Sequence, residues 1–470
     1  MIVVLSQGCA ANFGDGEKIA RILSQKSEVT FEFPEAKPAH STKAENSTSA
    51  ANPADFSTEK PEAFYLNVCT VKGNAGAMKL LRKAASTFPG VPIYITGCAP
   101  KDFHEEAIRA VPSIQFTSLK ELEDSAILPT QSAQSPSSLI NAHTPDSNKA
   151  SRNVLRESPF VGIVNIEEGC LDACAFCSTH LVKGRLHSFA PQTIVDQVQA
   201  LVDDGCLEIQ LTGQDCACYG FDIGTNLAEL TQRILTHVNG NYRIRLGMGN
   251  PRHVLSYQEA LLDCFTDDRI YKFIHIPVQS GSENVLKAMN RRHTARDYAT
   301  LAHAFTERFL KFTLSTDLIV GYPGETDADF NDTLKLLKET RPTICNITRF
   351  VARPGTVAAH LESTINSAHL EASNSERLAP APLAVPDTVK HERSAILAEA
   401  FQQIALENNR EWIGDECTVV TEKQGYRSGT TIARNEAYRP VALQGTFPAG
   451  QTLRVRVTEA EAFALIAKPL

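Results

Sequence analysis

The chain has 470 residues, 43% of them hydrophobic, and a formal net charge of −8 at pH 7. This length predicts two to four domains, and the negative charge argues against a simple nucleic-acid coat protein, although a local basic patch would still bind RNA. No run is long and apolar enough for a membrane span, and Met1–Cys9 lacks the basic region of a signal peptide. Twelve cysteines without an export signal are typical of a reducing compartment, so we expect a soluble cytoplasmic protein.

Residues 1–128 alternate short β-rich runs with helical stretches. We expect strands at Ile2–Ser6, Phe64–Val68 and Pro92–Thr96, and helices at Asp15–Ser27, Asn74–Ser86 and Phe103–Val111. This alternation predicts an N-terminal parallel α/β domain. Two polar stretches of low complexity interrupt the pattern, and we interpret residues 35–61 as an insertion and residues 129–155 as an interdomain linker.

Three cysteines share one place in this pattern. Cys9, Cys69 and Cys98 each follow directly after a predicted parallel strand. The carboxyl ends of parallel strands open onto one edge of the sheet, and neighbouring strands lie about 4.8 Å apart. The three thiols could therefore meet on one metal cluster, and Gly8 and Gly97 would let the backbone come close to it. The alternative is three buried core cysteines, because cysteine is among the most buried residues.

Residues 156–405 carry six strand-like runs that alternate with helices. The runs are Val161–Ile166, Leu207–Thr212, Tyr242–Met248, Tyr271–Pro277, Thr313–Val320 and Asn346–Val351. Six β/α units in this length predict a partial (β/α)6 barrel, since the eight-fold form needs roughly 250 residues. A polar stretch at residues 363–390 reads as an insertion, and a helix is expected around Glu392–Asn408.

The loop after the first of these strands holds three thiols at C-x3-C-x2-C spacing: Cys170, Cys174 and Cys177. Thiolates favour zinc, copper(I) or iron–sulfur clusters. A structural zinc site closes all four metal positions, usually with two pairs of ligands, and this loop has no fourth cysteine. An iron–sulfur cluster on three thiolates would instead leave one iron open to bind another molecule.

Polar, glycine-rich segments follow three later strands of the predicted barrel. They are Leu211–Asp215, His275–Ser282 and Asp317–Thr326. A barrel of this kind binds ligands at the carboxyl ends of its strands, so these segments are candidate ligand contacts. The alternative for His275 and Asp317 is a buried polar side chain that is satisfied within the protein.

Residues 409–470 contain short alternating strands separated by glycine turns, which predicts a small antiparallel β-barrel. The segment from Arg410 onward contains eight Lys or Arg residues and seven Asp or Glu residues, so this tail is nearly neutral in charge and rich in arginine.

The two cysteine triads, their order and the β-rich tail together resemble the radical S-adenosylmethionine (SAM) methylthiotransferases. The resemblance implies an N-terminal methylthiotransferase domain, a radical SAM barrel and a C-terminal RNA-binding TRAM domain. It implies that Cys9, Cys69 and Cys98 hold an auxiliary [4Fe-4S] cluster and that Cys170, Cys174 and Cys177 hold the [4Fe-4S] cluster that binds SAM. The SAM contacts implied are Thr212, Gly213, Gln214, Asp215, Gln279, Ser280, Asp317 and Gly321.

Three segments look like the archaeal and eukaryotic branch of this family: Val182–Phe189, Tyr219–Leu227 and Leu246–Pro251. Members of this branch convert N6-threonylcarbamoyladenosine at position 37 of tRNA to its 2-methylthio form. The insertions at 35–61 and 363–390, and Lys183 where arginine is commoner, depart from the pattern.

The implied reaction needs cofactors, because carbon 2 of adenine is an unactivated C–H that no side-chain acid or base can functionalise. The resemblance implies that one SAM yields a radical, that the auxiliary cluster delivers sulfur, and that a second SAM supplies the methyl group. We expect a monomer whose partner is the anticodon stem-loop of tRNA; the sequence identifies no electron donor or sulfur source. The alternatives are another tRNA adenosine derivative or a protein side chain as acceptor, and a non-catalytic iron–sulfur sensor.

Overall fold

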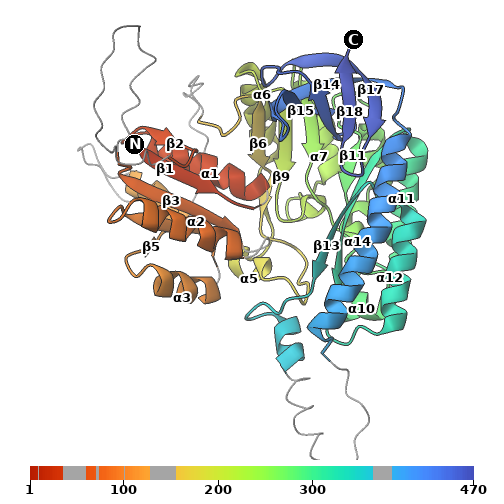
Figure 1. The fold of residues 1–470 in the computed structure, drawn as a ribbon, viewed down its shortest axis with the longest axis horizontal. Helices are drawn as coiled ribbons and strands as arrows, with labels where there is room; N and C mark the ends of the chain where they lie inside the picture. Colours follow the sequence, from red (N-terminus) through yellow and green to blue (C-terminus); the bar gives the residue numbers. More distant parts are fainter. Residues whose placement is uncertain (9, 35–59, 70–73, 100, 127–154, 364–383) are drawn as a thin grey trace, which may run out of the picture. The chain divides into compact units, whose positions relative to one another are not determined.

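The computed structural model describes residues 1–8, 10–34, 60–69, 74–99, 101–126, 155–363 and 384–470. The chain divides into two compact units, Met1–Glu157 and Ser158–Leu470 (Figure 1). Most of the predicted insertion at 35–61, of the predicted linker at 129–155 and of the predicted insertion at 363–390 lies outside the described residues. In the part of the chain that is described, no helix has both the length and the apolar character needed to cross a membrane.

The first unit contains a five-stranded parallel sheet with the strand order β2-β1-β3-β4-β5. Its strands are β1 (Ile2–Ser6), β2 (Val29–Thr30), β3 (Ala63–Cys69), β4 (Ile93–Cys98) and β5 (Gln115–Phe116), and its helices are α1 (Ala10–Leu23), α2 (Asn74–Thr87), α3 (Lys101–Ala110) and α4 (Leu119–Ala126). All seven residues of β3 are buried, as expected for a central strand whose two faces are both covered. The three predicted strands are confirmed, and β2, β5 and α4 were not predicted.

Helix α1 begins at Ala10, five residues before the predicted start at Asp15. The Asn12 side-chain amide donates to the carbonyls of Gln7 (2.7 Å) and Asn67 (3.0 Å), and the Asn67 amide donates back to the Asn12 carbonyl at 2.5 Å. This reciprocal contact fixes the first turn of α1 against the ends of β1 and β3. The helix runs on through Gly16, where a Cβ would overlap the Ser6 hydroxyl, so glycine permits the close approach to β1.

Glu17 on α1 makes the stability of the first unit depend on pH. Burial raises the pKa of Glu17 from 4.5 to about 7, against the opposing effects of the Glu157 N–H and Arg156. Because the folded-state pKa is the higher one, the favourable contribution is complete below about pH 4.5 and is lost as the pH rises through 7. We expect the first unit to lose on the order of 2 kcal/mol of unfolding free energy between pH 5 and pH 8.

Glu17→Gln should flatten this dependence, and the exposed Glu32→Gln should not. The unfolding of both units in guanidinium is followed by far-UV circular dichroism, and that of the second unit alone by the fluorescence of Trp412, the single tryptophan. A transition seen by circular dichroism but not by fluorescence therefore reports the unfolding of the first unit. An equal change with pH in Glu17→Gln and the parent protein would contradict the assignment.

The second unit contains six parallel strands that lie side by side in chain order. They are β6 (Val161–Asn165), β9 (Glu208–Thr212), β10 (Arg243–Leu246), β11 (Phe273–His275), β12 (Thr313–Val320) and β13 (Ile344–Arg349). They form the sheets β10-β9-β6 and β11-β12-β13, and a parallel bridge between Ile244 and Ile270 joins the two. The predicted partial barrel of six β/α units is thereby confirmed.

The remaining elements of this barrel cover the strands or line their ends (Figure 1). They are β7 (Glu167–Glu168), α5 (Thr179–Lys183), β8 (His187–Ser188), α6 (Pro191–Asp203), the 3-10 helix η2 (Cys216–Cys218), α7 (Leu227–His237), α8 (Pro251–Leu255), α9 (Gln258–Cys264), α10 (Glu283–Ala288), α11 (Ala295–Arg308), α12 (Asp327–Thr340) and α14 (Asp387–Arg410).

Helix α14 is longer than predicted at both ends. It begins at Asp387, so residues 387–390 belong to a helix and not to the expected insertion. Pro386 precedes the first turn, where proline's missing N–H costs no hydrogen bond. Lys390 in that turn is buried, with its ammonium 3.4 Å from Glu362 and over the ring of Phe350. Tertiary packing therefore extends the helix into a segment whose composition is typical of a loop.

A closed five-stranded barrel follows α14. Its strands are β14 (Glu416–Gln424), β15 (Thr430–Asn435), β16 (Pro440–Gln444), β17 (Thr452–Ala460) and β18 (Leu465–Pro469), in the order β14-β15-β16-β18-β17. The pairing of β16 with β18 is parallel and the other four pairings are antiparallel. The predicted antiparallel barrel is therefore mixed, because a closed ring with an odd number of strands cannot alternate direction throughout.

This barrel docks on the amino ends of the parallel strands of the same unit. The Tyr438 hydroxyl donates to the Glu208 carboxylate at the start of β9 (3.0 Å) and accepts from the Gln210 amide (3.3 Å). The Tyr438 ring packs edge-on against Tyr271 and lies under the Arg245 guanidinium. A backbone bond from Lys272 N–H to the Glu436 carbonyl (2.9 Å) completes the contact. The two barrels therefore form one packed body.

Candidate functional site

The three thiols at C-x3-C-x2-C spacing lie in a loop between β7 and α5, and hydrogen bonds fix its backbone. Cys170 N–H donates to the Gly184 carbonyl at 3.3 Å, and Cys177 N–H donates to the Cys174 carbonyl at 3.0 Å. Ala175 is held from both sides, because its N–H donates to Met289 and its carbonyl accepts from Ala358, both at 2.9 Å. The loop is thus shaped by the surrounding protein and presents three partly exposed sulfurs.

These sulfurs fit an iron–sulfur cluster. Burial raises the pKa of Cys174 to about 11, although the nearby Arg291 guanidinium lowers it. A thiol in such a place gives up its proton when a metal cation takes its charge. The three soft donors, their partial exposure and the fixed backbone together match the chemistry of such a cluster.

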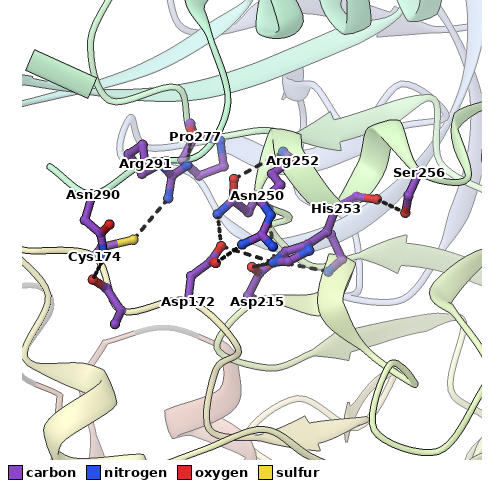
Figure 2. A network of polar contacts seen from close by, with 12 residues as sticks. Asp172, Cys174, Asp215, Asn250, Arg252, His253, Ser256, Pro277, Asn290 and Arg291 are labelled. Atoms are coloured by element: carbon purple, nitrogen blue, oxygen red, sulfur yellow. Dashed lines mark hydrogen bonds and ion pairs between the residues drawn. The ribbon is translucent and has the colours of Figure 1, made fainter. Parts of the chain in front are cut away.

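Asp172 lies inside the cysteine loop and ties it to the loop between β10 and α8 (Figure 2). Its carboxylate accepts from the Asn250 amide (2.5 Å) and the Arg252 guanidinium (2.6 Å), and lies 3.1 Å from His253 Nε2. Burial pushes the pKa of Asp172 upward, but the hydrogen bond and charge of His253, together with Arg252, outweigh it and leave the pKa below its ordinary value. The loop therefore carries an ionised, triply bonded anchor.

Three acidic or imidazole groups, Asp172, Asp215 and His253, approach one another closely enough to suggest a metal site. However, the Asp172 carboxylate already accepts from a guanidinium and an amide, and Asp215 Oδ1 accepts from the N–H groups of Asn250 (2.9 Å) and Ala217 (3.2 Å). Donors occupy the oxygens that a cation would need. The cluster is better described as a hydrogen-bonded anchor.

The segment Thr212–Asp215, predicted to contact SAM, lies directly beside the cysteine loop. Gln214 Oε1 accepts from Gly169 N–H at 2.8 Å, and Asp215 N–H donates to Glu167 Oε1 at 3.0 Å. A Cβ at Gly213 would overlap the Glu167 carboxyl, so this close packing requires glycine. Burial raises the pKa of Glu167 well above its ordinary value, and the carboxyl packs directly against the segment.

The predicted residues Gln279, in the segment after β11, and Asp317, within β12, also come together. Gln279 N–H donates to the Asp317 carbonyl at 2.8 Å, and Gln279 has a left-handed φ of 77°. Such a φ is unusual for a residue other than glycine, and strain of this kind concentrates at binding sites. The Asp317 carboxylate lies 3.1 Å from His275 Nε2 and accepts from Asn346 at 2.7 Å, so His275 and Asp317 satisfy each other.

Ser280 and Gly321, also predicted SAM contacts, have other neighbours in the structure. Ser280 is fully buried, and its hydroxyl lies 3.1 Å from Thr333 Oγ1 and accepts from Ser282 N–H. Gly321 N–H donates to the Glu325 carboxylate at 2.7 Å, and a Cβ on Gly321 would overlap Lys390. Ser280 shapes the segment that carries Gln279, and Gly321 shapes the loop that follows β12. The contact of Ser280 and Gly321 with SAM stays a prediction.

In the first unit, Cys69 and Cys98 are the last residues of β3 and β4 and are direct register partners across the two strands. Both are buried, and a Cβ on Gly8 would overlap Cys69. Cys9, the third predicted ligand, lies outside the described residues. Two of the three predicted thiols are therefore adjacent, and the residue before the third lies against one of them.

Several residues of the site were missed by the sequence reasoning. Glu167, Asp172, Asn250, His253 and Arg291 all contact the cysteine loop or the Thr212–Asp215 segment. Asp172 could have been found from its place between two ligand cysteines. Arg291 carries no local signal, because it reaches the loop from the far side of α10.

Six further cysteines are buried in the second unit, and one of them lies at the site. The Cys218 thiol is within hydrogen-bonding reach of the Cys170 thiol. The other five are core residues: Cys206, Cys216, Cys264, Cys345 and Cys417. Cys216 packs against Gly247, where a Cβ would overlap its sulfur.

Comparison with known proteins agrees with this arrangement. Residues 164–337 match the radical SAM superfamily and residues 410–470 match the TRAM domain. The probable threonylcarbamoyladenosine tRNA methylthiotransferase of Pyrococcus horikoshii is 32% identical over 451 residues, which cover 94% of this chain and 93% of that protein. The threonylcarbamoyladenosine tRNA methylthiotransferase of Homo sapiens is 33% identical over 287 residues, which cover 61% of this chain and 46% of that protein.

Among solved structures, a radical SAM methyltransferase from Kitasatospora setae with tryptophan and a SAM analogue bound aligns over 87% of this chain and 88% of that chain, at 13% identity and a TM-score of 0.48. These values are too low to support an inference. The Pyrococcus horikoshii relative, by contrast, exceeds 30% identity along nearly its whole length. The chain therefore belongs to the threonylcarbamoyladenosine tRNA methylthiotransferase family of radical SAM proteins.

Proposed function

We propose that this protein converts N6-threonylcarbamoyladenosine at position 37 of tRNA to 2-methylthio-N6-threonylcarbamoyladenosine. The observation that carries the proposal is the loop of Cys170, Cys174 and Cys177, which is fixed beside Thr212–Asp215. The chain also matches a probable threonylcarbamoyladenosine tRNA methylthiotransferase over 93% of that protein's length. Members of the radical SAM superfamily use SAM and a [4Fe-4S] cluster, and this loop supplies the donors for one.

The three thiols of the loop would hold the cluster, and SAM bound there supplies the radical chemistry that activates carbon 2. The residues that would contact SAM are Thr212, Gly213, Gln214, Asp215, Gln279 and Asp317. The first four form a segment beside the cysteine loop, and Arg291 links Cys174 to Pro277, just before Gln279, whose N–H donates to the Asp317 carbonyl. The buried carboxyl of Glu167 supports Gly213 from below, and Asp172 holds the loop through Asn250 and His253. No side chain is assigned as an acid or base.

A second [4Fe-4S] cluster would be held by Cys9, Cys69 and Cys98. Its support is the register pairing of Cys69 with Cys98 and the absence of a side chain at Gly8, which leaves space against Cys69. This cluster would supply the sulfur, and a second SAM would supply the methyl group.

The C-terminal barrel would bind tRNA. Arg454 and Arg456 are exposed on β17, each within hydrogen-bonding distance of Glu416 (2.8 and 2.6 Å), and Arg427 is exposed on the β14–β15 turn. Contacts between exposed arginines and RNA backbone phosphates depend little on base sequence and weaken as the salt concentration rises. The adenosine itself would be splayed out of the anticodon loop toward the cysteine loop. A tRNA substrate also supports a cytoplasmic location.

The proposal is tested by anaerobic purification, cluster reconstitution and incubation with SAM, dithionite and tRNA that carries N6-threonylcarbamoyladenosine. Nucleoside mass spectrometry should then detect a methylthio group on that nucleoside at position 37. If 5′-deoxyadenosine forms from SAM while this nucleoside stays unchanged, the substrate is another tRNA adenosine derivative or a protein side chain. If SAM is not cleaved by protein with its full iron content, the proposed reaction is wrong.

A further inference from the structure

Arg291 is the cation that contacts the cysteine loop at a thiol. It lies between α10 and α11, and its Nη1 donates to Cys174 Sγ at 3.5 Å (Figure 2). Its Nη2 donates to the Pro277 carbonyl at 2.6 Å. One guanidinium therefore bridges the middle thiol of the loop and the end of β11, just before Gln279.

The guanidinium is held in place by the protein itself. The short bond to Pro277 fixes its plane, and the neighbouring Asn290 amide donates to the Ala173 carbonyl at 2.7 Å, which fixes the adjacent turn against the same loop. The charge of Arg291 acts on the Asp172 and Asp317 carboxylates, since it helps to lower the pKa of each. The site thus contains a positive charge that cannot move away from Cys174.

We propose that Arg291 is a positioning residue that makes the cluster held by Cys170, Cys174 and Cys177 easier to reduce. Reduction transfers one electron to the cluster from an external low-potential donor, so the cluster gains one negative charge and no bond forms or breaks. A fixed positive charge beside a ligand sulfur stabilises the reduced form more than the oxidised form. Hydrogen bonds to the sulfurs and nearby charge are known to set the potential of such clusters.

This inference rests on the proposed function only in that the three thiols hold a cluster; it does not depend on the acceptor of the sulfur. Arginine and lysine separate the two parts of the role. Lysine keeps the charge but presents a single ammonium, which cannot bridge two acceptors as the planar guanidinium does. Glutamine keeps a hydrogen-bond donor and removes the charge.

The experiment uses the full chain with Cys69→Ala and Cys98→Ala, so that a single cluster remains. In this background we would compare Arg291→Lys and Arg291→Gln with the control Arg292→Gln. Arg292 is the next residue in the chain, and its side chain is exposed. The readouts are iron per chain and a dithionite titration followed by electron paramagnetic resonance. Arg291→Gln should shift the reduction equilibrium at least tenfold toward the oxidised form, which is 59 mV for a one-electron couple. The reduction equilibrium of Arg291→Lys should stay within about threefold of the parent's, which is about half that change on a logarithmic scale. The reduction equilibrium of Arg292→Gln should equal the parent's.

An Arg291→Gln protein with the parent's midpoint would overturn the proposal, and so would equal shifts in the Lys and Gln variants. If Arg291→Gln assembles no cluster, Arg291→Lys decides alone. If the Arg291→Lys protein has the parent's midpoint potential, the role of the charge is supported. If its midpoint potential is lower, the effect comes from the lost bridging geometry and the proposal is overturned. Failure of the unchanged parent to assemble a cluster would count against the proposed function instead.

Discussion

Changing Cys174 to alanine is expected to abolish the cleavage of SAM, whereas changing Cys98 to alanine should leave this cleavage intact and abolish only the methylthio product. Cys174 is the middle thiol of the loop beside Thr212–Asp215, and Cys98 ends a strand of the other unit. Two thiols cannot replace the three that we propose as ligands of the SAM-binding cluster, so the loss should reach the detection limit. Both products, 5′-deoxyadenosine and the modified nucleoside, are measured in one reaction.

The matched control is Cys264→Ala. Cys264 is buried at the end of α9, and its thiol donates to the carbonyls of Ala260 (3.3 Å) and Ala228 (3.5 Å), so the change removes a core sulfur without touching the site. It should cost about 1 kcal/mol of stability and keep both products. Loss of SAM cleavage in Cys98→Ala protein that retains the iron of the other triad would contradict the division of labour.

Changing Arg393 to alanine should destabilise the second unit by about 3–5 kcal/mol, because it leaves a buried carboxylate without its partner. Arg393 Nη1 lies 2.6 Å from Glu325 Oε2, and the two side chains are 7% and 0% exposed. Trp412 is buried in the C-terminal barrel of the same unit, so its fluorescence in urea measures the effect. Asp327→Ala is the control: Asp327 contacts the other nitrogen of Arg393 at 2.7 Å but is 92% exposed, and its loss should cost under about 1 kcal/mol.

The loss of unfolding free energy in the Arg393→Ala variant, relative to the parent protein, should grow as the pH rises. Burial raises the pKa of Glu325, and the Gly321 N–H and Arg393 partly oppose this. Removing Arg393 raises the pKa further, so the folded variant binds a proton more tightly than the unfolded chain does. A raised folded-state pKa contributes stability at low pH that is lost as the pH passes through it. The difference between variant and parent should therefore be larger at pH 8 than at pH 5, and a constant difference would exclude Glu325 as its source.

The sequence predicted what is local and periodic. The bounds of β1 and β12 were predicted to the residue, because buried apolar runs end there at polar or glycine-rich segments. The cysteine loop was likewise evident from spacing alone. In the small barrel the sequence predicted strands at Glu416–Thr421, Pro440–Leu443 and Thr452–Val457 but missed β15 and β18. The buried face of β15 consists of polar or small residues (Thr431, Ala433 and Asn435), so this strand shows no apolar alternation in the sequence. The parallel pairing of β18 follows from closure of the ring, which no single segment reveals.

The contacts that hold the site could not be predicted in the same way. Asp172 meets Asn250 and His253 only because the sheet has the order β10-β9-β6. Arg291, in the segment between α10 and α11, contacts Cys174 although the two are 117 residues apart in the chain. Such partners depend on tertiary placement. Ser280 and Gly321 illustrate a second limit, because the contacts that these two residues make within their own loops were not predicted from the polar strand-end motif.

The C-terminal barrel packs around Tyr438 at the amino ends of the strands, whereas the cysteine loop lies at their carboxyl ends. Glu208, which Tyr438 contacts, and Thr212, beside the cysteine loop, mark the two ends of β9. These two residues are four strand steps apart, which is about 13 Å. A polynucleotide that touches both places must reach along the side of the barrel for at least that distance. An RNA substrate that gains from both places must therefore bridge the two ends of β9, and an RNA that reaches only the cysteine loop would lose any contribution from the β14–β18 barrel.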